Sequence, residues 1–142
     1  MVSQPKPLRL LAQDAEDLAV ISAALQDAVL RVGDIALDPK AKQLTLMLNR
    51  YRWEQGGGER VRTGLQIAGV QKVQTRRVRR GTPDAVLELL ALTFTPGEPP
   101  GGVVTLAFAG GADLRVEVEC VEAVMADMSR PWPTRREPAH DL

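Results

Sequence analysis

Apolar and polar positions alternate with a period of two along most of the chain, a pattern typical of half-buried β-strands. Short apolar or β-branched runs begin at Ala28 and are separated by turn residues at roughly ten-residue spacing, as in antiparallel sandwiches and barrels. Seven runs are predicted as strands: residues 28–37, 43–53, 60–68, 70–78, 86–95, 103–109 and 114–120. In the last of these, Leu114, Val116 and Val118 share one face, so the pattern assigns that face to the core.

The period changes near the start of the chain. Residues 8–12 follow two prolines, which cannot donate to a strand ladder, and are predicted as an edge strand. Asp14 then stands where a helix N-cap is expected, and Leu18, Ile21 and Leu25 recur at helical spacing. The sequence therefore predicts an amphipathic helix from Asp14 to about Leu25.

A second helix is predicted after the last strand, because Val121, Val124, Met125 and Met128 also fall at helical spacing. Seven antiparallel strands followed by a helix is the element order of the pleckstrin-homology superfold. We therefore expect an α+β, mostly antiparallel fold: a pleckstrin-homology-like bent sandwich or barrel of about seven strands, with a C-terminal helix and an extra N-terminal strand and helix. A two-layer α+β sandwich with both helices on one face is the alternative.

The length of 142 residues fits one domain, which we expect to span residues 1–129. Residues 130–142 contain three prolines, and we expect them to form a mobile tail in which Trp132 packs at the start. One cysteine cannot form an intramolecular disulfide, and no apolar run approaches the ~20 residues that span a bilayer. A cytoplasmic location is the expectation.

Charge is segregated along a chain whose formal net charge is zero. Residues 50–80 carry nine basic side chains against Glu54 and Glu59. A candidate anion or partner surface is predicted from eight of them: Arg50, Arg52, Arg60, Arg62, Arg76, Arg77, Arg79 and Arg80. If the strands that carry the first four are neighbours, their guanidinium groups form one patch, with Tyr51 and Trp53 between them as stacking surfaces. The alternative is structural pairing of these arginines with Glu88, Glu117 and Glu119, or across a homodimer, and a core position for the two aromatic residues.

Apart from these arginines, the sequence contains few residues that could catalyse a reaction or bind a metal or a phosphate group. His140 stands near the end of the predicted tail, and Cys120 ends a core-facing row, so neither is expected to be catalytic. Histidine and cysteine do not cluster, and the glycine run at residues 56–58 lacks a phosphate-binding pattern. Glu117 and Glu119 alternate with core residues and are expected to face water. The sequence thus predicts no catalytic residue, no metal and no cofactor.

Residues 14–34, residues 48–54 and Trp132 resemble a family of short alphaproteobacterial proteins catalogued only as a domain of unknown function. The resemblance covers most of the chain. It implies a bacterial cytoplasmic protein and transfers no functional residue.

These observations favour a small binding or adaptor module that is not an enzyme and that uses the arginine-rich surface. A protein partner or a second copy is the expected ligand, with no membrane span. Two alternatives stay open: a protein that binds nucleic acid or another anionic ligand through the same arginines, and an enzyme that uses carboxylates only. Salt dependence separates the first alternative, because binding that neutralises phosphates weakens steeply with salt.

Overall fold

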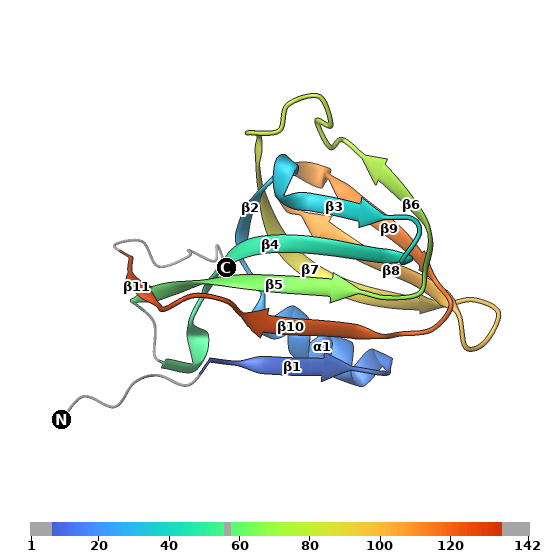
Figure 1. Cartoon of the computed structure of the whole chain (residues 1–142), viewed down its shortest axis with the longest axis horizontal. Coiled ribbons are helices and arrows are strands. Elements are labelled where there is room, and N and C mark those ends of the chain that lie inside the picture. The colour runs from blue at the N-terminus through green and yellow to red at the C-terminus, as the bar shows by residue number, and fades with distance from the viewer. Residues whose placement is uncertain (1–6, 56–57, 135–142) are drawn as a thin grey trace.

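The structure is a computed structural model, and it describes residues 7–55 and 58–134 (Figure 1). Within these residues, one α-helix, eleven strands and three short 3₁₀ turns follow one another in this order: β1 (Arg9–Ala12), α1 (Ala15–Ala24), β2 (Val29–Arg31), η1 (Val32–Asp34), β3 (Ile35–Asp38), β4 (Gln43–Tyr51), η2 (Trp53–Gln55), β5 (Glu59–Ile67), β6 (Val70–Arg76), β7 (Val86–Pro96), β8 (Gly102–Phe108), η3 (Ala109–Gly111), β9 (Asp113–Val118), β10 (Ala123–Asp127) and β11 (Trp132–Pro133). The predicted α+β, mostly antiparallel class is confirmed.

The strands form one bent antiparallel sheet in the order β1-β10-β5-β4-β2-β7-β8-β9-β6, with β3 on β4 and β11 on β5. In Figure 1, β1, β10, β5, β4 and β3 form a front layer, and β7, β8 and β9 lie behind it. The sheet passes from the front to the back through β2, which pairs with both β4 and β7. Leu46, Leu65 and Leu106 are fully buried between the layers.

Helix α1 forms where the sequence predicts it. The Asp14 side chain caps it by accepting a hydrogen bond from Asp17 N at 2.8 Å. Leu18 and Ile21 are buried, and the helix packs against both β1 and β7. The Ser22 hydroxyl accepts a hydrogen bond from Leu92 N on β7. The helix therefore covers the space between β1, at one edge of the sheet, and β7 in the opposite layer.

The predicted C-terminal helix is wrong, because Ala123–Asp127 is strand β10. The apolar residues in this segment fit both a helical period and the strand period of two. The structure follows the strand period, because Val121, Ala123 and Met125 are buried. As a strand, the segment pairs with β1 on one side and β5 on the other. This pairing satisfies the backbone hydrogen bonds, and it decides between the two periods in a way that local sequence cannot.

Two other boundaries differ from the prediction. The first predicted run is interrupted by η1, and the separated strands β2 and β3 pair with different parts of β4. The predicted tail begins too early, since Trp132 pairs with Arg60 on β5 and Thr134 N donates to Gly58 O at 2.9 Å. The remainder of the predicted tail, with His140, lies outside the described residues.

The close approach of β7 to the start of β8 gives a stability test. A Cβ added to Gly102 would overlap Thr95 O and come within 2.7 Å of the Phe94 ring. We expect Gly102→Ala to reduce the free energy of unfolding by about 1–3 kcal/mol in urea denaturation, because the backbone must shift. Gly81→Ala is the control, since nothing lies within 4 Å of its added Cβ. Equal effects of the two changes would contradict the packing assigned to β8.

Candidate functional site

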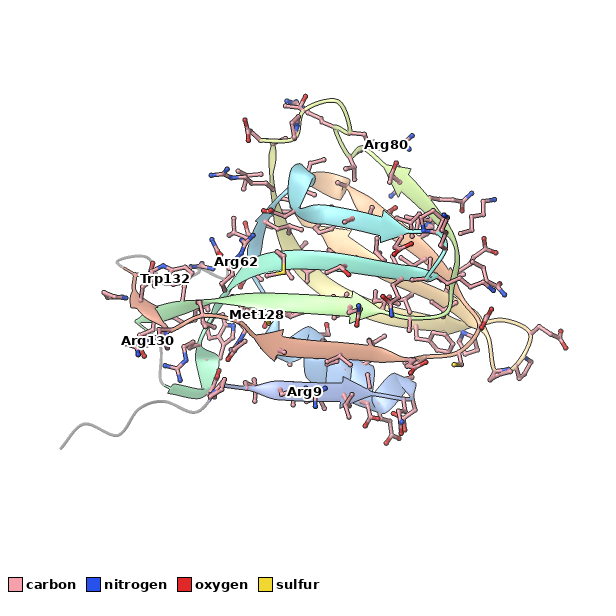
Figure 2. All side chains as sticks on the ribbon, in the orientation of Figure 1. Arg9, Arg62, Arg80, Met128, Arg130 and Trp132 are labelled. Carbon is pink, nitrogen blue, oxygen red and sulfur yellow. The ribbon has the colours of Figure 1, made fainter. Side chains whose placement is uncertain are left out.

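The structure separates the eight predicted arginines into three groups. Arg50 and Arg52 are buried at the end of β4, at 0% and 2% exposure. Arg60 and Arg62 lie on β5, while the remaining four lie at the end of β6 and in the loop after it; Arg62 and Arg80 are far apart in Figure 2. β4 and β5 are neighbours, as the prediction required, but the continuous patch of four guanidinium groups does not form.

Arg50 is the centre of a buried ion network. Its Nε and one terminal nitrogen donate to the two carboxylate oxygens of Asp127, each at 2.8 Å. Its terminal nitrogens also donate to Glu54 at 2.9 and 2.6 Å. Asp127 accepts two further hydrogen bonds, from Leu8 N and the Thr63 hydroxyl, both at 2.9 Å. The network thus joins β4, η2, β5, β10 and the residue before β1.

Hydrogen bonding sets the protonation state of this network. For Asp127, burial opposes ionisation, but hydrogen bonds from Arg50, Leu8 N and Thr63 outweigh it and lower the carboxyl pKa. The hydrogen bond from Arg50 also lowers the pKa of Glu54. Burial acts to lower the pKa of Arg50, yet its bonds to the two carboxylates raise it overall. All three groups are therefore charged at neutral pH.

Arg52 and the two neighbouring aromatic residues are also held by internal contacts. Arg52 donates to Glu59 at 2.7 Å. Tyr51 is buried, and its hydroxyl accepts a hydrogen bond from Gly58 N at 2.7 Å. Trp53 donates through its indole nitrogen to Gln26 O at 3.2 Å and meets Tyr51 edge to face. These contacts favour the structural interpretation of Tyr51 and Trp53 over a stacking surface.

Arg60 and Arg62 point to the outer side of the sheet but also have partners. The Arg60 guanidinium lies 5.8 Å from the centre of the Tyr51 ring and donates to Asn49 O. Arg62 forms an ion pair with Asp34 at 3.3 Å and a hydrogen bond to Asn49. Three of these four arginines form ion pairs, and the sequence pattern does not predict their partners. The partners are Asp127 and Glu54 for Arg50, Glu59 for Arg52 and Asp34 for Arg62.

One signal for the buried position of Arg50 was present in the sequence. Arg50 continues the alternating row of Leu44, Leu46 and Leu48, all of which are buried. A charged residue in phase with a core row points inward and needs a partner of opposite charge. Asp127 is that partner, but it is 77 residues away in the chain, and local patterning does not reveal it.

Arg76 pairs with Asp113 on β9, and the other three arginines lie at or next to an opening in the folded sheet. β6 pairs with β9 alone and β3 with β4 alone among the described strands, so a free edge of β6 faces a free edge of β3. At one end the opening closes where Val70 N donates to Lys42 O at 2.9 Å. At the other end, Gly33 N donates to Pro83 O at 2.8 Å. Its inner wall includes Leu44 and Leu114, and we call it the β3–β6 cleft.

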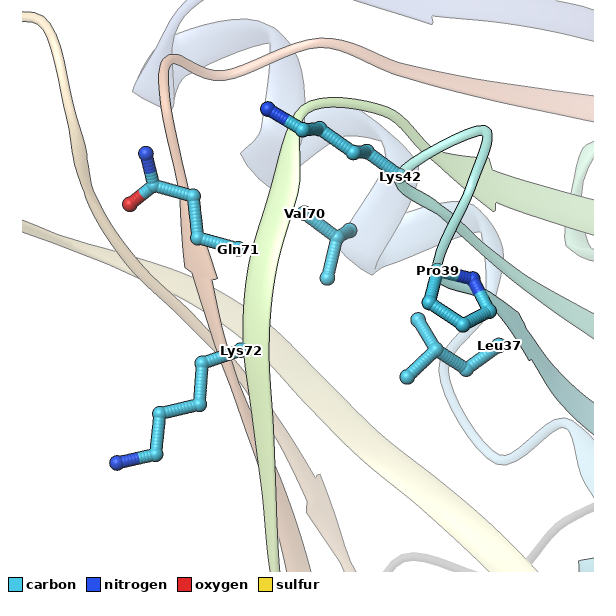
Figure 3. A pocket seen from close by; sticks show the side chains of 6 residues that line it. All are labelled: Leu37, Pro39, Lys42, Val70, Gln71 and Lys72. Atoms are coloured by element: carbon cyan, nitrogen blue, oxygen red, sulfur yellow. The ribbon is translucent and has the colours of Figure 1, made fainter.

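Two adjoining hollows lie along this cleft, and a third adjoins them beyond its Gly33–Pro83 end. The first, of about 360 Å³, lies between Leu37 and Pro39 on one side and Gln71 and Lys72 on the other (Figure 3). It shares Leu37 with a second hollow of about 390 Å³ that has mostly apolar walls. The second shares Val32 with a third hollow of about 320 Å³, next to the loop after β6. Volumes of this size accommodate side chains or small ligands.

Cations line the cleft and the hollow beyond its end. Lys42 and Lys72 contribute to the first hollow, Arg80 to the second, and Arg77 and Arg79 to the third. No carboxylate lines any of the three among the residues that the structure describes. Lys42 is paired with Glu119 at 3.1 Å, whereas the other four cations have no ion-pair partner within residues 7–55 and 58–134. The cleft therefore combines apolar walls with uncompensated positive charge.

No group of three or more His, Cys, Asp or Glu side chains in the described part of the chain could hold a metal ion. Cys120 is half-buried and unpaired by a disulfide. Within residues 7–55 and 58–134, no helix has the length and apolar character that crossing a membrane requires.

A family model described as protein of unknown function (DUF2948) matches residues 8–140. The chain belongs to the DUF2948 family. This confirms the predicted membership of a family of unknown function. No curated protein and no solved structure matches the chain, and the pleckstrin-homology-like arrangement stays a prediction. DUF2948 membership names no ligand, so the geometry of the cleft carries the functional argument.

The Arg50 network gives a prediction for stability. Asp127→Asn keeps the side-chain size but removes the charge that balances a fully buried guanidinium. We expect this variant to lose about 3 kcal/mol of unfolding free energy in urea denaturation, because an uncompensated buried charge is costly. Asp84→Asn is the matched control: the Asp84 side chain is 89% exposed and lies 3.8 Å from Arg31, so its loss should stay below about 0.5 kcal/mol.

The same network predicts a dependence on pH. The pKa values of Asp127 and Glu54 are lowered on folding, so the network stabilises the protein fully above the ordinary carboxyl pKa. This contribution disappears as the pH falls through the lowered values. Unfolding free energies measured between neutral and acidic pH should therefore fall more steeply in the parent protein than in Asp127→Asn. Parallel pH profiles of the two proteins would contradict the assigned network.

Proposed function

We propose that this chain is a non-catalytic binding module that holds an acidic segment of a partner protein in the β3–β6 cleft. The observation that carries the proposal is the lining of three adjoining hollows by five cations and, among the described residues, by no carboxylate. A surface built this way attracts negative charge and disfavours cationic partners. The module would act through this cleft, with the buried arginines serving the fold.

The unpaired arginines support an anionic ligand. Arg80 is exposed and lines the mainly apolar second hollow, so its charge is accessible to a ligand bound there. The loop that carries it is held by backbone hydrogen bonds from Thr82 N to Arg79 O and from Val32 N to Ala85 O. These bonds place the guanidinium groups on a defined backbone, which reduces the entropy that a ligand must remove on binding.

The walls favour a protein segment over nucleic acid. Ile35, Leu37 and Val73 line the second hollow beside Arg80, and apolar side chains of a partner would fill it. Single-stranded nucleic acid is usually bound by aromatic side chains on which bases stack. No aromatic residue lines the three hollows within the described chain, while Tyr51 and Trp53 are held elsewhere.

A charge-removal experiment tests the proposal. A fluorescently labelled oligoglutamate peptide should bind the parent protein at low salt, and the double variant Arg79→Gln/Arg80→Gln should weaken binding about tenfold or more. The matched control is Arg9→Gln/Arg130→Gln, which removes the same charge at exposed positions far from Arg80 (Figure 2). Fluorescence anisotropy measures both, and a single-stranded RNA of equal charge serves as the competing ligand.

The proposal requires the control variant to bind the peptide as the parent protein does. Equal weakening by the two double variants would show that binding follows net charge and not the cleft. Tighter binding of RNA than of peptide, with a steeper salt dependence, would replace the proposal with the nucleic-acid alternative. Absence of peptide binding at low salt would end it.

A further inference from the structure

Strand β6 has the longer of the two free edges that end the strand order. It has seven residues and pairs with β9 on one side. On its other side Val70 N donates to Lys42 O, and the residues after Val70 face the β3–β6 cleft. At the opposite end of the order, β1 has four residues and contacts α1. Backbone N–H and C=O groups along a free edge can pair with an extended segment of another chain.

The side chains of β6 divide between two faces. Val73 and Thr75 are half-buried and line the second hollow, whereas Lys72, Gln74 and Arg76 are exposed. Successive side chains of any strand point to opposite faces of a sheet. A strand added beside β6 would therefore place every second side chain against the apolar walls and the intervening ones beside Lys72 and Arg76.

We propose, resting on the function proposed above, that the partner segment is an extended strand of alternating apolar and acidic residues that pairs with the free edge of β6. Its apolar side chains lie against Ile35, Leu37 and Val73. Its acidic side chains lie beside Lys72, which has no ion-pair partner among the described residues, and beside Arg76.

The charges on β9, the strand paired with β6, favour acidic residues in the added strand. In the β6–β9 register, Lys72 lies opposite Glu117, and Arg76 lies opposite Asp113, with which it forms an ion pair at 3.3 Å. At each of these two positions, an acidic residue of β9 thus lies beside a basic residue of β6. A third strand with acidic residues continues that order, and opposite charges on neighbouring strands each contribute roughly 0.2–1 kcal/mol.

The shape of the cleft favours an extended segment over a compact small molecule. The first and second hollows are arranged in series along the cleft, since both are lined by residues of β3 and β6 and they share Leu37. The six residues of β6 after Val70 correspond to about 20 Å of strand. A segment of five or six residues, at about 3.3 Å per residue, would follow this length and contact several cations in turn.

Synthetic peptides of one composition test the inference. The first peptide alternates valine and glutamate, and the second carries the same residues as one valine block and one glutamate block. We expect the alternating peptide to bind the full-length protein about tenfold more tightly in fluorescence anisotropy, because only alternation matches the two faces of β6. Hydrogen exchange should show increased protection of β6 amides on binding and none in β1, the control edge.

Backbone methylation of the alternating peptide tests strand pairing directly. Only every second N–H of an added strand points toward β6. Methylating the amides of one alternating set should therefore weaken binding about tenfold or more, while methylating the other set should change it less than about twofold.

The outcomes separate the two proposals. Three results together would overturn strand pairing and leave the acidic-segment function standing. These are equal binding of the alternating and block peptides, equal behaviour of the two methylated forms, and weaker binding of every peptide to Arg79→Gln/Arg80→Gln. If neither peptide binds the parent protein at low salt, both proposals are overturned. Selective loss with one methylated set, together with protection in β6, supports both.

Discussion

The burial of Arg50 constrains the rest of the structure. A fully buried guanidinium is tolerated only with opposite charge and several hydrogen bonds around it. Asp127 and Glu54 supply both, and Asp127 is in turn bound by Thr63 and by Leu8 N. Because these groups come from both ends and the middle of the chain, the network defines how β10 and β1 are placed on β5 and β4. An ion network of this kind gives specificity of arrangement more than net stability.

Local patterning was sufficient for most of the fold. Six of the seven predicted runs correspond to single strands, β4 to β9, and the cap at Asp14 locates the helix. The segment from Val121 to Met128 was assigned wrongly because its apolar residues satisfy a helical and a strand period together. Pairing partners on both sides decided between them, and those partners lie more than 50 residues away in the chain. Tertiary context of this kind overrides a short local pattern.

The candidate site was predicted only in part, for a related reason. The count of arginines between residues 50 and 80 shows an excess of positive charge but not which side chains are buried. Arg50 is in phase with a leucine row and is buried, whereas Arg80 follows the end of a strand and lies at the cleft. The cleft itself depends on β3 and β6 having no partner on one side among the described strands, which is a property of the strand order. No single segment of sequence contains that information.

The bent sheet leaves two of its sides to be covered, and the chain treats them differently. Helix α1 lies between β1 and β7, but the described residues provide nothing equivalent between β3 and β6. Free strand edges promote aggregation, and positive charge placed beside them reduces pairing between identical copies. Lys72 and Arg80 are so placed, and an edge protected against its own copies by positive charge accepts an acidic strand for the same electrostatic reason. Protection and recognition at this edge therefore follow from one arrangement of charges.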